Sequence, residues 1–173
     1  VYNVAVGYDA GVSVTTGTLN TLIGSLSGDA FNTGQENTAI GYQALTADTK
    51  GKFSVAVGNN ALATQNFTSA TSAFNTAVGY DAGLHITTGV QNTFVGALAG
   101  DGTNDGTNNV AVGFEALSAN CGSGNTAIGT RAGKITTADN NTFVGNNAGI
   151  AITSGAGNTF IGAEAGDGTD DGT

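Results

Sequence analysis

The chain of 173 residues contains no proline, no methionine and no tryptophan, and it has a single cysteine, Cys121. One cysteine excludes an internal disulfide framework. A chain without proline is able to form uninterrupted ladders of backbone hydrogen bonds. No segment approaches the ~20 consecutive apolar residues of a membrane-spanning helix. We therefore predict that the chain does not insert into a membrane as a helix.

Basic residues are also scarce. Four of them (Lys50, Lys52, Arg131 and Lys134) stand against thirteen acidic residues, for a net charge of −9. Affinity for nucleic acids comes largely from Lys and Arg contacts to phosphates, and anionic membranes attract basic segments for the same reason. The charge balance therefore predicts neither a nucleic-acid partner nor an anionic membrane surface.

No nucleophile–base pair, metal-ligand cluster or phosphate-binding loop is evident, which favours a protein that is not an enzyme. The 29 glycines follow a structural period, so they are not expected to cradle phosphates. The apolar fraction is 39% and consists mostly of Ala and Val. Only 10% of residues are charged, which differs from the charged composition of disordered chains. Small apolar residues at regular intervals predict a thin core shared between stacked coils.

A repeat accounts for the whole chain. Its first position is asparagine in nine coils and Ser54 in the fourth, and the steps between coils are 17, 17, 17, 21, 17, 17, 16, 16 and 17 residues. A fixed short period of this kind is typical of a solenoid. The asparagines are Asn3, Asn20, Asn37, Asn75, Asn92, Asn109, Asn125, Asn141 and Asn158.

Each coil begins with a strand-like pattern. Position two is Thr or Val, position three is Ala, Leu or Phe, position four is always Val or Ile, and position five is always Gly. Alternate side chains of a strand point to opposite faces, so positions two and four share one face and position three the other. The glycine predicts a sharp turn with positive φ. Position eight is Ala except at Ser27, which predicts a second short strand or edge pointing into a narrow interior.

Such a unit cannot bury a face alone, whereas stacked coils can. We predict an all-β fold, a parallel β-solenoid of ten coils of about 17 residues, forming one repeat domain over residues 1–173. Rungs about 4.8 Å apart would give a rod roughly 45–50 Å long. Asparagines in register can hydrogen-bond along a ladder of identical neighbours. The 21-residue step carries an insertion at about residues 65–72, which is predicted to loop out of the rod.

The pattern also indicates continuation from one copy to the next. If a second copy followed Thr173, its Asn3 would stand 18 residues after Asn158, close to the normal step. This spacing favours either a longer array or subunits that stack head to tail into a filament.

The coil motif, as in Asn3-Val-Ala-Val-Gly and Asn37-Thr-Ala-Ile-Gly with a small residue three positions after the glycine, resembles the YadA-like head repeats of trimeric autotransporter adhesins. Similar repeats occur in phage tail-fibre-like proteins. The resemblance covers essentially all 173 residues, although the period here is longer than in that family. It implies a left-handed β-roll, a homotrimer, and a surface that binds host matrix or other receptors.

Two acidic turns are candidate calcium sites. Oxygen-rich glycine turns suit Ca²⁺, which takes six to eight oxygen ligands. The alternative is a pair of solvated turns closed by Asx hydrogen bonds. The candidate ligands are Asp101, Asn104, Asp105, Asp167, Asp170 and Asp171.

Two columns of side chains are candidate surfaces. Tyr8, Tyr42, Tyr80 and Phe114 each follow a turn glycine. They would either form an exposed stripe for a host surface protein or glycan, or pack over neighbouring coils or between subunits. The threonines at position two would either order water as an ice-binding face or pair within the ladder toward the core or a partner subunit.

Together these patterns predict a structural and adhesive module of an extracellular fibre, at a cell surface or on a virion, that associates with itself. The alternatives are a filament subunit that stacks head to tail, a phage tail-fibre segment and, less favoured, an ice-binding protein.

Overall fold

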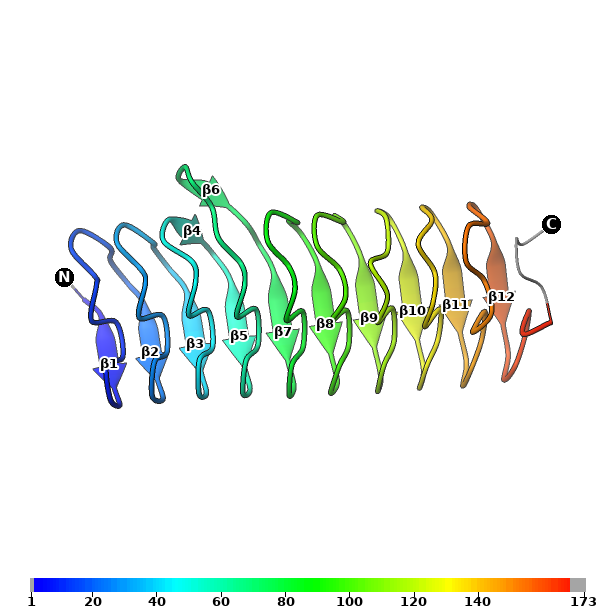
Figure 1. Ribbon diagram of the computed structural model, residues 1–173, viewed down its shortest axis with the longest axis horizontal. Coiled ribbons are helices and arrows are strands. Elements are labelled where there is room, and N and C mark those ends of the chain that lie inside the picture. The colour runs from blue at the N-terminus through cyan, green and yellow to red at the C-terminus, as the bar shows by residue number, and fades with distance from the viewer. Residues whose placement is uncertain (1, 169–173) are drawn as a thin grey trace.

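The computed structural model describes residues 2–168, and these form strands and turns without any helix. Ten strands of three residues each stack as one parallel sheet along a rod (Figure 1). They are β1 (Val4–Val6), β2 (Thr21–Ile23), β3 (Thr38–Ile40), β5 (Val55–Val57), β7 (Thr76–Val78), β8 (Thr93–Val95), β9 (Val110–Val112), β10 (Thr126–Ile128), β11 (Thr142–Val144) and β12 (Thr159–Ile161). The predicted parallel β-solenoid is confirmed.

The register follows the repeat. Val4 lies opposite Thr21, and Val6 lies opposite Ile23. The same pairing of like positions continues through β11 and β12, where Val144 lies opposite Ile161. Successive windows of about 17 residues are therefore rungs, and position four stacks on position four along the rod. The handedness implied by the family resemblance stays a prediction.

The sheet has one inner and one outer face. Position three is inward, and its side chains in β2 to β11 are completely buried. Positions two and four point outward, so Val78 and Val95 remain 38% and 37% exposed. The inner column contains Leu22, Ala39, Ala56, Ala77, Phe94, Ala111, Ala127 and Phe143. The predicted thin core is confirmed, since most of these residues are alanine.

The glycine at position five has two separate requirements. Its φ lies between 130° and 143° in all ten coils, a region open to glycine and strained for other residues. From Gly7 to Gly145, an added Cβ would also lie only 2.2–2.7 Å from the carbonyl oxygen of the equivalent glycine in the next coil. Any side chain here would force the rungs apart, which explains why position five does not vary.

Position eight lies in a turn, so the prediction of a second short strand there is wrong, although the inward direction is right. The alanines at this position are buried, as Ala82 and Ala99 show. The residues on either side have positive φ, for example 53° at Asp81 and 60° at Gly83. A backbone with left-handed residues at alternate positions cannot stay extended. Each coil therefore curls back toward the sheet at this point.

The core is filled by complementary residues at positions three and nine. The buried Phe94 faces Gly100, where an added Cβ would lie 2.6 Å from the phenyl ring. The small Ala56 instead shares its coil with the buried Leu62. Where both positions are small, neighbouring coils fill the space, and a Cβ on Gly83 would meet Leu62 at 2.9 Å and Phe94 at 3.0 Å. The rungs therefore interlock.

The insertion only partly loops out. Residues 68–70 are exposed, but the side chains of Gln65 and Phe67 are buried. A second small sheet forms where β6 (Thr71–Ser72) pairs in parallel with β4 (Gly51–Lys52), and this pair projects beside the rod (Figure 1). The main sheet keeps its register across the insertion.

Candidate binding surfaces and the asparagine ladder

The asparagine column forms a buried ladder of side-chain hydrogen bonds. Asn92 Oδ1 accepts from the backbone N–H of Asn109 at 3.0 Å, and Asn92 Nδ2 donates to the Gly106 carbonyl at 2.9 Å. The backbone N–H of Asn92 in turn donates to Asn75 Oδ1 at 2.9 Å. Each amide therefore joins its own turn to the next coil. The predicted alignment of asparagines is confirmed.

The one gap in this column is filled by the insertion. Ser54 replaces asparagine, and the buried Gln65 side chain occupies the neighbouring space. Gln65 Nε2 donates to Ser54 Oγ at 3.2 Å and to Asp48 Oδ2 at 2.6 Å, while Gln65 Oε1 accepts from Asn75 Nδ2 at 2.8 Å. The serine and the insertion are therefore one structural feature.

Asp48 is a fully buried carboxylate at the same place. Its Oδ1 accepts from the backbone N–H of Gly51 at 2.9 Å. Burial raises the pKa of the Asp48 carboxyl above its ordinary value of 3.8, and the hydrogen bonds from Gln65 and from the backbone partly oppose that shift. The group sits inside the rod, so its role is structural and not that of a surface ligand.

The outer face of the sheet is an uncharged surface along the rod, built from positions two and four. We call it the Thr/Val face. Its Val and Ile side chains at position four range from half-buried, as at Ile40 and Val57, to 70% exposed at Ile161. The threonines beside them are half-buried in β2 to β11, for example Thr93. The threonine column faces outward, so of the earlier alternatives the orientation toward the core is wrong.

The four aromatic residues after the turn glycine form an exposed column. Tyr8, Tyr42, Tyr80 and Phe114 are 73%, 47%, 55% and 42% exposed. They occupy position six of the first, third, fifth and seventh coils. The carbonyl of each position six accepts from the N–H of position seven in the next coil, as in Leu98 to Tyr80 at 2.9 Å. The rings therefore lie in register and are exposed. Packing over neighbouring coils or between subunits stays a prediction.

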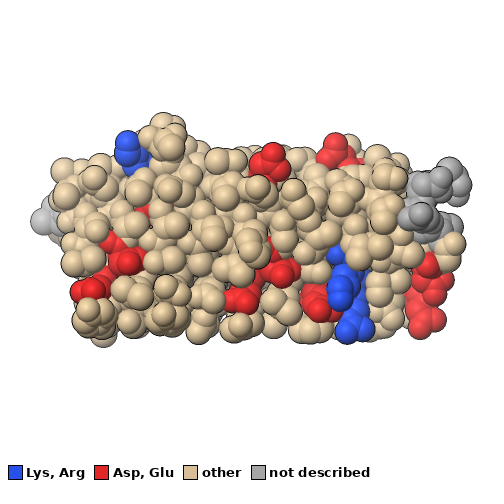
Figure 2. Space-filling view, viewed as in Figure 1, with Lys and Arg blue, Asp and Glu red and all other residues tan. Residues whose placement is uncertain are grey.

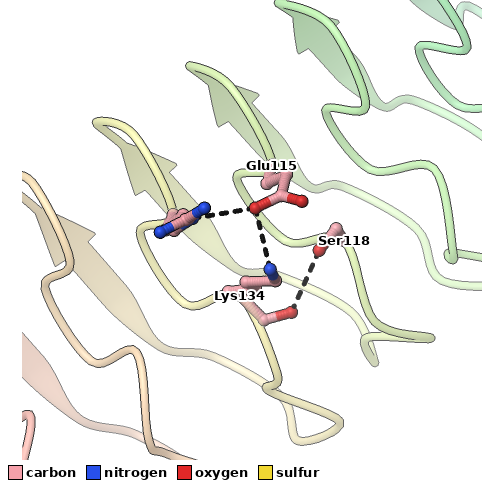
Figure 3. A network of polar contacts seen from close by, with 4 residues as sticks. Glu115, Ser118 and Lys134 are labelled. Atoms are coloured by element: carbon pink, nitrogen blue, oxygen red, sulfur yellow. Dashed lines mark hydrogen bonds and ion pairs between the residues drawn. The ribbon is translucent and has the colours of Figure 1, made fainter.

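Polar side chains flank this aromatic column at position seven. Asp81 Oδ1 accepts from Asn60 Nδ2 at 2.9 Å, and hydrogen bonding to Asp81 raises the pKa of the Tyr80 hydroxyl. Farther along, Glu115 Oε2 accepts from Arg131 Nε at 2.9 Å and from Lys134 Nζ at 2.8 Å (Figure 3). Hydrogen bonds from Lys134 and Arg131 lower the pKa of the Glu115 carboxyl. The column thus carries donors and acceptors beside its rings.

The acidic turn that begins at Asp101 is hydrogen-bonded to the neighbouring coils. Asn104 is exposed, its N–H donates to Asn120 Oδ1 at 3.0 Å, and its Oδ1 accepts from the Thr87 hydroxyl. Asp105 is exposed, while Asp101 is half-buried, and burial raises the pKa of the Asp101 carboxyl.

Within residues 2–168, no three His, Cys, Asp or Glu residues group closely enough to hold a metal ion. Asp167 is exposed, and Asp170 and Asp171 lie outside the described residues. Calcium binding stays a prediction.

Charge is thinly distributed over the rod. Figure 2 shows one side, where small groups of acidic side chains are separated by neutral surface. Within the described range, no helix long and apolar enough to span a membrane is found. Comparison with protein-family models, with curated proteins and with solved structures finds no match for this chain.

Proposed function

We propose that this chain is a structural and adhesive module of an extracellular fibre, in which a stiff rod presents repeated side chains to a binding partner. The observation that carries the proposal is the unbroken parallel ladder from β1 to β12. One sheet runs the length of the rod, and the asparagine ladder accompanies it inside. The exposed columns on this scaffold repeat at each rung or at each second rung.

The contacts support stiffness. Each strand of the main sheet contacts only its sheet neighbours, as in other solenoids. Every rung from Gly7 to Gly145 also excludes a Cβ at position five. Bending the rod would therefore open main-chain hydrogen bonds on one side and compress glycine contacts on the other. A rod of this kind suits extension away from a surface.

Self-association follows from the Thr/Val face. An exposed, uncharged stripe with Val or Ile in every rung is the kind of surface that marks protein interaction sites. We assign this face to contacts between copies, side by side in a homotrimer. The head-to-tail filament is the alternative, because the register that joins one coil to the next is the same at every step and can continue into a second copy.

Electron microscopy of the purified chain, with its mass in solution, tests the proposal. Short rods with the mass of three chains support a trimeric module, and long fibres support the filament. Substituting lysine for Val78 and Val95 on the Thr/Val face places like charges on adjacent rungs and should release monomers. A globular particle with no elongated shape would overturn both forms of the proposal.

A second candidate function, ice binding, is favoured by one observation. Threonines at position two and Val or Ile at position four form two adjacent outward ranks on a regular sheet. Such a face could order water along the rod. Thermal hysteresis of the purified chain would support this function, and freezing at the colligative point would dismiss it.

A further inference from the structure

The spacing of the aromatic column is specific. Tyr8, Tyr42, Tyr80 and Phe114 recur at every second rung, which places them about 9.6 Å apart along the rod. The rungs between them carry smaller residues at the same position. These are Ser25, Asn59 and Ala97, and Thr130 follows on the rung after Phe114. Four separate rings therefore stand at regular intervals above a lower surface.

Polar side chains lie beside each ring at position seven. On the rungs that carry a ring, position seven is Asp9, Gln43, Asp81 or Glu115, each of which has an oxygen acceptor. Position seven supplies the donor Asn60 on one intervening rung and the donor Arg131 on the rung that follows Phe114. A ligand lying along this column would therefore meet exposed aromatic rings at fixed intervals and hydrogen-bonding groups beside them.

From this arrangement we propose that the aromatic column binds an extended β-1,4-linked polysaccharide, which lies along the rod. The proposal rests on the adhesive function proposed above. The face of a pyranose ring with equatorial hydroxyls presents C–H groups, so it packs on an aromatic ring as other apolar surfaces do. Its hydroxyls lie around the edge, where they both donate and accept hydrogen bonds.

The linkage follows from the spacing. In an extended β-1,4 chain, successive rings are turned over, so the same face recurs at every second sugar. That repeat is close in length to two rungs of this solenoid. A curved α-linked chain would leave the line of rings after one or two contacts. A nucleic acid is disfavoured because the chain has four basic residues against thirteen acidic ones.

The test is depletion of the intact chain from solution by insoluble cellulose and by chitin, with starch granules as the α-linked comparison. We expect binding to at least one β-linked solid and none to starch. Replacing Tyr42 or Tyr80 with alanine should weaken binding about tenfold each, the loss of one stacking contact. Tyr2→Asn is the matched control, because Tyr2 is 82% exposed but lies outside the column, and asparagine tolerates its positive φ.

A rearranged variant tests the spacing itself. Exchanging two residues, Tyr42→Asn together with Asn59→Tyr, keeps the composition but moves one ring by a single rung. Binding should fall as far as in Tyr42→Ala, with an unchanged circular dichroism spectrum. Equal binding by the rearranged variant, or no binding to either β-linked solid, would overturn the proposal. Rods that adhere to other surfaces in that case would leave the broader fibre function standing.

Discussion

Removing one amide from the asparagine ladder should destabilise the rod far more than removing an exposed amide. In Asn92→Ala, the Asn109 N–H loses its acceptor and the Gly106 carbonyl loses its donor. Both lost contacts belong to a column in which Asn92 and Asn109 are completely buried. An unsatisfied buried group costs about 1–3 kcal/mol, so two such groups should lower the free energy of unfolding by about 2–6 kcal/mol.

Urea unfolding followed by circular dichroism measures this loss, and hydrogen exchange locates it. The matched control is Asn146→Ala, which removes an exposed asparagine and should change the free energy of unfolding by no more than about 0.5 kcal/mol. The Asn109 amide should exchange faster in Asn92→Ala than in the control. Equal stability of the two variants, with equal denaturant slopes, would refute the view that the ladder holds the coils together.

Three further predictions concern the core, the buried acid and the turns. Phe94→Ala removes a fully buried ring and should cost about 3–5 kcal/mol in urea unfolding, whereas Phe114→Ala, which removes an exposed ring, should cost much less. Burial raises the folded pKa of Asp48, so the native state binds a proton more tightly than the unfolded state does. The stability that this protonation contributes is fully present below pH 3.8 and is lost as the pH rises through the folded pKa. The stability of the wild type relative to Asp48→Asn should therefore fall as the pH rises above 3.8, and a flat difference would contradict the assignment. Calcium held at the Asp101 turn would raise the melting temperature with calcium concentration, and equal melting temperatures in EDTA and in Ca²⁺ would remove that prediction.

The repeat predicted the stacking because its constraints are local and recur in every coil. Gly96 is an example. Its φ of 135° requires glycine, and an added Cβ would lie 2.7 Å from the Gly113 carbonyl oxygen in the next coil. The turn can therefore be recognised in the sequence, because glycine occupies this position in every coil. The asparagine column was predictable for the same reason. A side chain that bonds to the equivalent position of the next rung must be of the same type in each coil, so it recurs in the sequence at every period.

The inner and outer faces of the sheet were harder to assign. Both alternating sets contain apolar residues, and hydrophobicity alone would place Val95 inside in preference to Ala77. The structure does the opposite, because the turns close so near the sheet that mostly alanine fits, and Phe94 is admitted only opposite Gly100. Only a pairwise comparison of positions three and nine would have revealed this.

The candidate surfaces depended on the same assignment. Exposure of Tyr80 and Phe114 could not be derived from their sequence positions, since an aromatic residue after a turn packs inward as readily as outward. One sequence feature hinted that Gln65 fills the gap in the asparagine column. Ser54 and the insertion both depart from the repeat, and they do so in the same coil. Two departures within one coil indicate that one residue replaces a contact that the other has lost.

The ladder also gives the rod a direction. In every described ladder asparagine that bridges two coils, the side-chain oxygen accepts from the coil that follows it and not from the coil before. At this column the two faces of a coil are therefore chemically unlike, with the amide oxygen on one face and the backbone N–H that donates to the preceding oxygen on the other. Whole coils can be added or lost without changing this direction of the hydrogen bonds. A coil inserted in the reverse orientation would instead place acceptor against acceptor or donor against donor in the column. Length is thus free to vary in evolution while orientation is not.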